Sequence, residues 1–139
     1  MYEYHVKSIT NVVDGDTIDV DIDLGFDISF SSRVRMAGID TPESRTTNKT
    51  EKILGLEAKD YLKKKLKDAK SIIIKTEKMD SSEKYGRILG WLYINDDKIS
   101  VNDHMINDGY AWGYLGETKS KDFEALAKVR AKSKKWLFR

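Results

Sequence analysis

The chain of 139 residues contains no cysteine, two histidines and one proline. Without cysteine, disulfides, thiolate zinc sites and cysteine nucleophiles are excluded. His5 and His104 lie far apart in the sequence, and neither has a second histidine nearby. A histidine-based metal site and a Ser-His-Asp arrangement are therefore disfavoured.

Long apolar runs are also absent, and those that occur are as short as Ile72 to Ile74. We therefore expect no membrane-spanning segment. The opening residues, Met1 to His5, lack the charged-then-apolar layout of an export signal. This predicts a cytoplasmic protein as the chain stands, or a secreted one if a leader has been removed.

The composition is that of one folded domain, which we expect to span residues 1–139. Hydrophobic residues make up 40% of the chain and charged residues 35%, as in ordinary globular proteins. The net charge of +2, from 25 basic and 23 acidic residues, does not by itself indicate a nucleic-acid partner. It does permit local basic patches.

The apolar spacing predicts an α+β domain in which five strands form a small barrel and three helices pack on it. Ile18, Val20 and Ile22 alternate with aspartates, which is the period of a half-buried strand. The expected order is three strands within residues 2–37, a loop over 38–50, a helix containing the apolar residues from Ile53 to Leu66, strands at 71–78 and 88–94, and helices at 101–107 and 120–135.

The sequence leaves the start of the first helix open, and it predicts the buried face of the last helix from spacing alone. Asn48 followed by Glu51 resembles a capping box, whereas Gly55 favours a later start of that helix. In the last helix the spacing places Phe123, Leu126, Ala127 and Val129 on the inward face. We expect the lysines of both helices to be solvated.

Carboxylates at two places could bind a hard cation. Asp16 has the same strand parity as Ile18, so it should point toward the apolar side and need a partner. Asp40 and Glu43 flank Pro42 in a loop, and Asp16, Asp40 and a loop carbonyl would form a partial calcium shell. The alternatives are a turn aspartate that bonds backbone N–H groups and an ordinary capped loop.

A second acidic run and a basic loop are less specific. Asp19 to Asp23 imitates the start of an EF-hand loop, but Leu24 occupies the position of the turn glycine, so we interpret it as a solvated strand face. Lys84 to Arg87 offers a guanidinium that can grip phosphate oxygens, although any basic hairpin tip looks similar.

Taken together, these motifs resemble the staphylococcal nuclease-like (thermonuclease) family. They are Val12 to Thr17, Arg35 before Asp40 to Glu43, and Lys84 to Arg87, and the resemblance continues through Gly55 to Ala58 and the basic C-terminal helix. It implies an OB-fold barrel and a calcium-dependent phosphodiesterase that cleaves DNA and RNA at the bond to the 5′ oxygen and leaves 3′-phosphate ends.

The resemblance also implies roles for residues around the metal. Asp16 and Asp40 would ligate calcium beside the carbonyl of Thr41, and Asp14 would hold a water of the metal shell. Glu43 would orient or deprotonate the attacking water. Such an arrangement suits phosphodiester hydrolysis, where negative charge builds up on the phosphate oxygens in the transition state.

Further residues would contact the substrate. The resemblance implies that Arg35 and Arg87 grip the scissile phosphate and that Lys84 and Tyr85 contact a neighbouring terminal phosphate. The family's tyrosine pair in the nucleotide pocket is only partly present, because Tyr114 can fill one place while Trp112 offers a different stacking face.

Two non-enzymatic alternatives remain. One is a catalytically silent OB-fold module that binds nucleic acid or protein, and the other is a structural calcium-binding domain. Because Asp16, Arg35, Asp40, Glu43 and Arg87 are all present, the sequence favours the nuclease. We expect DNA and RNA substrates, no membrane partner and a monomer.

Overall fold

The computed structural model describes residues 2–77, 88–114 and 121–137. The strands are β1 (Tyr2–Asp14), β2 (Thr17–Asp23), β3 (Ser29–Met36), β4 (Ile39–Asp40), β5 (Ile72–Thr76), β6 (Ile88–Ile94) and β7 (Trp112–Gly113). The helices are α1 (Lys49–Lys67), α2 (Val101–Asn107) and α3 (Phe123–Leu137).

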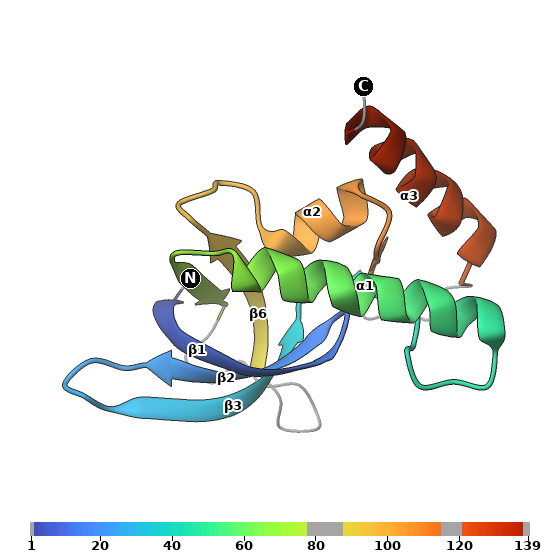
Figure 1. Ribbon diagram of the computed structural model, residues 1–139. Coiled ribbons are helices and arrows are strands. Elements are labelled where there is room, and N and C mark those ends of the chain that lie inside the picture. The colour runs from blue at the N-terminus through green and yellow to red at the C-terminus, as the bar shows by residue number, and fades with distance from the viewer. Residues whose placement is uncertain (1, 78–87, 115–120, 138–139) are drawn as a thin grey trace.

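Within the described residues, five strands close a barrel in the order β1-β2-β3-β6-β5. All neighbouring pairs are antiparallel except β3 and β6, which run parallel. The hairpin of β2 and β3 extends beyond the barrel, and α1 runs along the side of the barrel (Figure 1). The α+β fold with a five-stranded OB-type barrel and three helices is thus confirmed.

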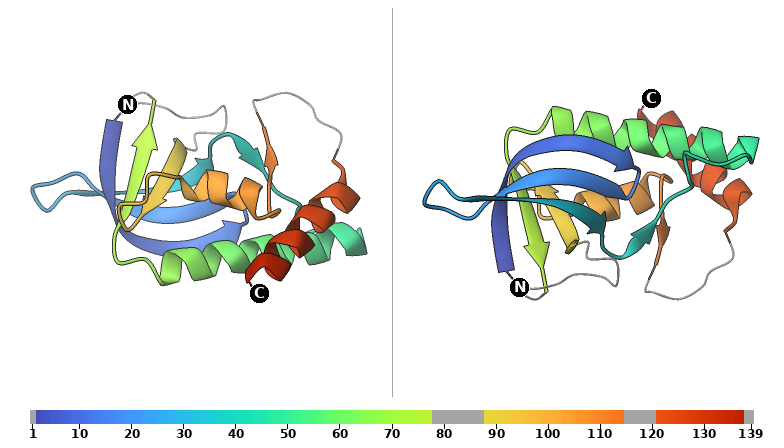
Figure 2. Two further views of the ribbon diagram at one scale, coloured as in Figure 1. Left: turned by 90° about the horizontal axis from the view of Figure 1, so that it is seen from above. Right: turned by 90° about the horizontal axis from the view of Figure 1, so that it is seen from below.

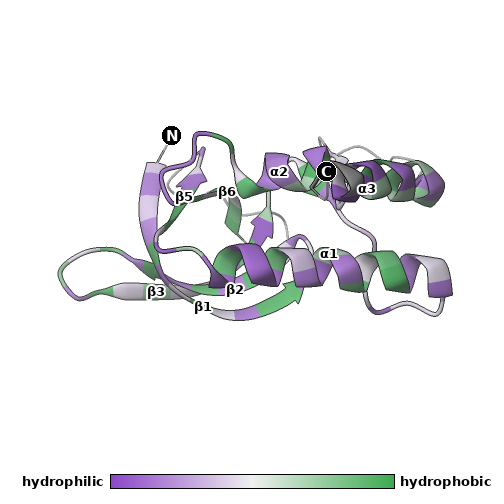
Figure 3. Cartoon of the chain, turned by 45° about the horizontal axis from the view of Figure 1, so that its top comes forward, coloured by the Kyte–Doolittle hydropathy of each residue, from purple (hydrophilic) through white to green (hydrophobic). Residues whose placement is uncertain are grey.

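The barrel interior follows the alternation seen in β2. Ile18, Val20 and Ile22 are buried, while the aspartates between them face outward. They meet Ile74 and Leu92 from the opposite strands, and α1 adds Leu62 and Leu66. Along α1, hydrophobic and hydrophilic residues alternate in bands (Figure 3). None of the described helices combines the length and apolarity needed to cross a bilayer.

Helix α1 begins where the cap signal placed it. The Asn48 side chain accepts a hydrogen bond from the Glu51 N–H at 3.1 Å, so the later start suggested by Gly55 is wrong. Gly55 has a packing role instead, because a Cβ at this position would overlap the carbonyl groups of Pro42 and Glu43. The helix therefore lies directly against the loop that follows β4.

The loop expected over residues 38–50 contains a short strand that the sequence did not reveal. Ile39 pairs with Gly113 and Asp40 pairs with Trp112, which forms the two-stranded sheet of β4 and β7. The Tyr114 N–H continues the pairing with a 2.8 Å hydrogen bond to the Gly38 carbonyl. This contact brings the region after α2 next to Asp40.

Helix α3 buries a narrower face than its sequence predicts. Leu126 is buried and Phe123 is half-buried, but Ala127 and Val129 are exposed, so the expectation for those two was wrong. Arg130 is buried in their place, with 3% of its surface exposed. In Figure 2, α3 crosses near α1 at the side of the barrel.

Candidate active site

Asp16 lies in the turn between β1 and β2 and points inward as its parity predicts. Its residue is 8% exposed, and one carboxylate oxygen accepts a 2.9 Å hydrogen bond from the Thr17 hydroxyl. The other oxygen accepts the Thr41 N–H at 3.2 Å. Because Thr41 is 25 residues away in the sequence, Asp16 is more than a local turn residue. It joins the β1–β2 turn to the loop after β4.

Arg35 brings Asp16 and Asp40 together. Its Nη2 lies 3.5 Å from Asp16 Oδ2 and 3.6 Å from Asp40 Oδ1. Its Nη1 donates to the Met36 carbonyl at 2.9 Å, which fixes the plane of the guanidinium. The register of β2 and β3 places Arg35 opposite Thr17, the residue after Asp16. Two carboxylates from distant segments therefore share one cation.

Asp14, Asp16, Arg35 and Asp40 form a partly buried cluster of charged side chains, which we call the notch, and its carboxylates repel one another. Burial raises the pKa of Asp40, and the nearby Asp16 charge raises it further, while Lys121 and Arg35 offset part of the rise. Burial likewise raises the pKa of Asp14, against hydrogen bonding from Ser44, and the Asp16 charge adds to the increase. Like charges gathered in a partly desolvated space are stabilised by an additional cation.

The donor set fits a calcium ion that keeps several waters. Within the described residues, no three His, Asp or Glu side chains form a metal-binding group. The protein ligands expected from the sequence are the carboxylates of Asp16 and Asp40 and the carbonyl of Thr41. Nearby, Asp14 Oδ1 is buried and has no hydrogen-bond partner among the described residues. Calcium accepts carboxylates, carbonyls and waters together, so these oxygens suit it.

Glu43 lies in the loop after β4, two residues beyond Thr41. The residue is exposed, and its backbone N–H donates to Glu51 Oε2 at 3.2 Å. Among the described contacts, no hydrogen bond or ion pair joins its carboxylate to Asp16, Asp40 or Arg35. The backbone position is nevertheless fixed by α1, because Gly55 lies against the Glu43 carbonyl.

The residues expected to contact substrate divide into two groups. Tyr114 is half-buried and follows β7, beside the strand that carries Asp40. Lys84, Tyr85 and Arg87 lie outside the described residues, so their predicted roles stay predictions. The described part of the chain resumes at Ile88, which pairs with the neighbour of Arg35 in β3.

Two residues of this region were missed by sequence reasoning. Glu51 accepts the Glu43 N–H and lies 3.6 Å from the Lys121 ammonium. The position of Glu51 after an N-cap asparagine was visible, but its contact with the loop depends on how α1 packs. Lys121 precedes α3 and has no motif around it, so no sequence signal could have identified it.

Comparison with known proteins gives a family match. Residues 33–136 match the model of the family described as Staphylococcal nuclease homologue. The thermonuclease of Staphylococcus hyicus is 28% identical over 127 residues, covering 91% of this chain and 70% of that protein. The thermonuclease of Staphylococcus intermedius is 33% identical over 93 residues, covering 67% of this chain and 51% of that protein.

An uncharacterized protein of Methanocaldococcus jannaschii is 29% identical over 139 residues, which cover 87% of this chain. The chain spans 65% of the length of that archaeal protein and 44% of an uncharacterized Bacillus anthracis protein that is 34% identical over 102 residues. These relatives are thus longer proteins that share this domain.

Proposed function

Because the chain belongs to the staphylococcal nuclease homologue family, we propose that it is a calcium-dependent phosphodiesterase acting on DNA and RNA. It hydrolyses the bond between phosphorus and the 5′ oxygen and leaves 3′-phosphate ends. The observation that carries this proposal is the pair of Asp16 and Asp40 around the Arg35 guanidinium in a half-buried notch.

The chain's own groups match what phosphodiester hydrolysis requires. Asp16, Asp40 and the Thr41 carbonyl would hold calcium, which would supply a Lewis acid that polarises the phosphoryl oxygens. Arg35 is held by its bond to the Met36 carbonyl, so its guanidinium faces the phosphate without reorganising. Arg87 would add a second guanidinium from the segment before β6.

Glu43 is suited to orient or deprotonate the attacking water. It is exposed and is not one of the two carboxylates expected to bind the metal, so its carboxylate can accept a proton without giving up a metal ligand. Its backbone is held by Glu51 and by the close packing of Gly55. Precise placement of a general base accounts for a large part of such rate enhancements.

A silent OB-fold module of the same family is the second candidate function. Such a module would need the barrel but not the cluster of charged groups within it. Arg35 offsets the charge of Asp16 and Asp40 only in part, because burial and Asp16 still raise the pKa of Asp40, and burial also raises the pKa of Asp14. Three such carboxylates are costly to keep unless a further cation binds there. The notch therefore favours the enzyme over the binding module.

The decisive experiment is a digest of single-stranded DNA and RNA with calcium, with magnesium and with a chelator. We expect cleavage with calcium and none with the chelator, and products that prime a polymerase only after their 3′-phosphates are removed. Magnesium should support little turnover, because it demands a smaller octahedral shell than this ligand set offers. Equal cleavage in the chelator would refute the proposal.

Two variants separate the roles within the notch. Asp16→Asn should lose both calcium binding and turnover, whereas Asp19→Asn should keep both, because Asp19 pairs with Arg33 on the outer face of the barrel. Glu43→Gln should still bind calcium and oligonucleotide but react slowly. If Glu43→Gln lost oligonucleotide binding, its assignment to the attacking water would be wrong.

A further inference from the structure

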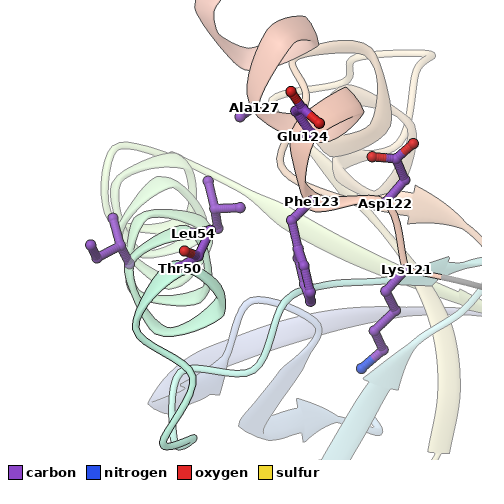
Figure 4. Close-up of a pocket in the computed structure, with 8 residues that line it drawn as sticks. Thr50, Leu54, Lys121, Asp122, Phe123, Glu124 and Ala127 are labelled. Atoms are coloured by element: carbon purple, nitrogen blue, oxygen red, sulfur yellow. The ribbon is translucent and has the colours of Figure 1, made fainter.

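A hollow of about 670 Å³ lies between the first turns of α1 and the start of α3. Its volume is within the range of sites that hold a small organic ligand. Figure 4 shows the Phe123 ring and the Lys121 side chain extending from the start of α3 into the space beside α1. Its lining is mainly apolar and includes Thr50, Ile53, Leu54, Lys121, Phe123 and Ala127.

Lys121 connects this hollow to the catalytic notch. Its ammonium lies 3.6 Å from Glu51 Oε2, the same oxygen that accepts the Glu43 N–H. It is also near enough to Asp40 to lower the pKa of that carboxyl, against the larger rise from burial. A cation that lines the hollow is thus also close to Glu51 and Asp40.

Aromatic side chains form a second connection. The rings of Trp112 and Phe123 lie 5.6 Å apart at their centroids, with an interplanar angle of 60°. Trp112 pairs with Asp40 in the sheet of β4 and β7. Asp40, Trp112 and Phe123 are therefore successive neighbours, of which the last lines the hollow.

We propose that the hollow is a subsite for a second nucleoside of a single-stranded substrate whose scissile phosphate lies in the notch. The base enters against Phe123 and the apolar side chains of α1, and Lys121 pairs with the phosphate that links it to the notch. This inference rests on the proposed function. Stacking on an aromatic ring tolerates any base, so the subsite adds affinity without strong sequence preference.

The acidic residues at the hollow agree with this orientation. Asp122 caps α3, with Oδ1 accepting the Ala125 N–H at 2.9 Å, and Glu124 is exposed beside it. These two carboxylates repel a phosphate from the interior but can accept hydrogen bonds from the amino groups of bases. The neutral base is therefore the part of the nucleotide that enters, and the phosphate stays at Lys121.

The test measures binding of trinucleotides of single-stranded DNA in calcium, by fluorescence anisotropy. All variants are made in the Glu43→Gln background so that the ligand stays intact. Each oligomer is compared with versions in which the first or the last base is replaced by an abasic site. We expect one of the two abasic versions to bind about tenfold more weakly than the intact oligomer.

Ile53→Asp tests the apolar wall. Ile53 is 60% exposed, so the change should leave the fold intact, which a thermal unfolding curve checks. The Ile53→Asp change should weaken binding of the intact oligomer about tenfold. The abasic site should then cause no further loss of affinity in this variant, because both changes remove the same contact between the base and Ile53. Leu56→Asp is the matched control, since Leu56 is 47% exposed on the same helix and does not line the hollow.

Two more variants test the other walls. Phe123→Leu keeps bulk against Trp112 but removes the stacking face, and should act like Ile53→Asp. Lys121→Gln should weaken binding of every trinucleotide. It should also make the slope of log affinity against log salt concentration shallower, by about the amount expected for one phosphate contact.

The outcomes distinguish the subsite from the proposed function. If trinucleotides bind and the wild-type chain cleaves DNA, but Ile53→Asp behaves like Leu56→Asp, the subsite is refuted and the nuclease stands. The subsite is also refuted if each abasic site weakens oligomer binding to the Ile53→Asp variant as much as it weakens binding to the Glu43→Gln parent. If no trinucleotide binds and no cleavage occurs, both proposals fail.

Discussion

Gly55 of α1 lies directly against the backbone carbonyl of Glu43, so closely that a Cβ at this position would overlap the oxygen. Helix α1 also accepts the Glu43 N–H through Glu51. The loop between Asp40 and Glu43 is therefore held from one side by the helix backbone and from the other by the bond between Thr41 and Asp16. The rigidity of the candidate site depends on this packing.

Gly55→Ala should destabilise the protein and slow the reaction. In an open helix, alanine at a glycine position would stabilise by roughly 1 kcal/mol. Here the added methyl group must displace the loop, and overpacking of this kind costs about 1–3 kcal/mol. Urea unfolding and turnover on single-stranded DNA measure the two effects, with the exposed Lys52→Ala on the same helix as control. Unchanged turnover would show that the loop does not depend on α1.

Arg35→Gln should separate calcium binding from catalysis. In the metal-free protein, Arg35 supplies the positive charge shared by Asp16 and Asp40. Removing it leaves the carboxylates free for calcium, so calorimetry should give an affinity no weaker than that of the wild type. Turnover should fall on the order of a hundredfold or more, because a fixed donor to the transition state is lost.

The control for this experiment is Arg33→Gln, two residues earlier on the same strand. Arg33 pairs with Asp19 at 2.8 Å on the outer face, away from the notch. This variant should retain both calcium affinity and turnover. A loss of calcium binding in Arg35→Gln alone would mean that the guanidinium builds the metal site and does not compete for it.

The notch should also affect how stability varies with pH. The pKa of Asp14 is raised above its usual value of 3.8, mainly by burial, so the folded protein disfavours the ionised form. The folded state then binds more protons than the unfolded state between 3.8 and the raised pKa, and stability falls as pH rises through that window. Well below pH 3.8 the Asp14 carboxyl is protonated in both the folded and the unfolded state, so it no longer lowers the free energy of unfolding.

Asp14→Asn should therefore raise the free energy of unfolding at pH 7 in a chelator, with a gain that shrinks as pH falls toward 4. Urea titrations at several pH values measure this difference. Asp60→Asn is a suitable control, since Asp60 is exposed and forms a surface ion pair with Lys64. A gain that is equal at pH 7 and pH 4 would contradict the electrostatic origin.

The parts of this molecule that follow from local pattern could be predicted, and those that depend on distant packing could not. The alternation around Ile18 predicted β2 and the inward position of Asp16, because a strand has a fixed period of two. The pairing of Asp40 with Trp112 involves two-residue strands with no periodicity to detect. Gly55 reads locally as a helix breaker and becomes favourable only against the loop.

The charged residues show the same division. The grouping of Asp16, Arg35 and Asp40 was predicted from the resemblance of their motifs to the staphylococcal nuclease-like family. Lys121 comes close to Glu51 and Asp40 only because α3 packs across α1, and β5, β6, α2 and β7 separate these two helices in the sequence. The burial of Arg130 could not be predicted, because a charged residue in a lysine-rich helix is normally solvated.

Arg130 joins α3 to the rest of the domain. Its Nε donates to the Gly109 carbonyl at 3.1 Å, and its Nη1 donates to the Leu54 carbonyl at 3.2 Å and to Glu57 at 2.7 Å. Its guanidinium also lies 4.2 Å from the centroid of the Tyr110 ring. The residue thus bridges α1, α3 and the turn after α2, and Leu54 lines the proposed nucleoside subsite.

Arg130→Met should destabilise the protein by about 2–4 kcal/mol, because two buried carbonyl groups lose their donors. Lys128→Met on the exposed side of the same helix should have little effect, and the difference is measured by urea unfolding. At temperatures where Arg130→Met stays folded, binding of trinucleotides should lose its dependence on the second base, because the wall formed by α3 is no longer held against α1. Cleavage of the shortest substrates should persist, since Arg35 lies on β3, Asp16 in the turn before β2, and Asp40 on β4, which pairs with β7 and not with α3. Loss of both together would mean that α3 supports the notch itself.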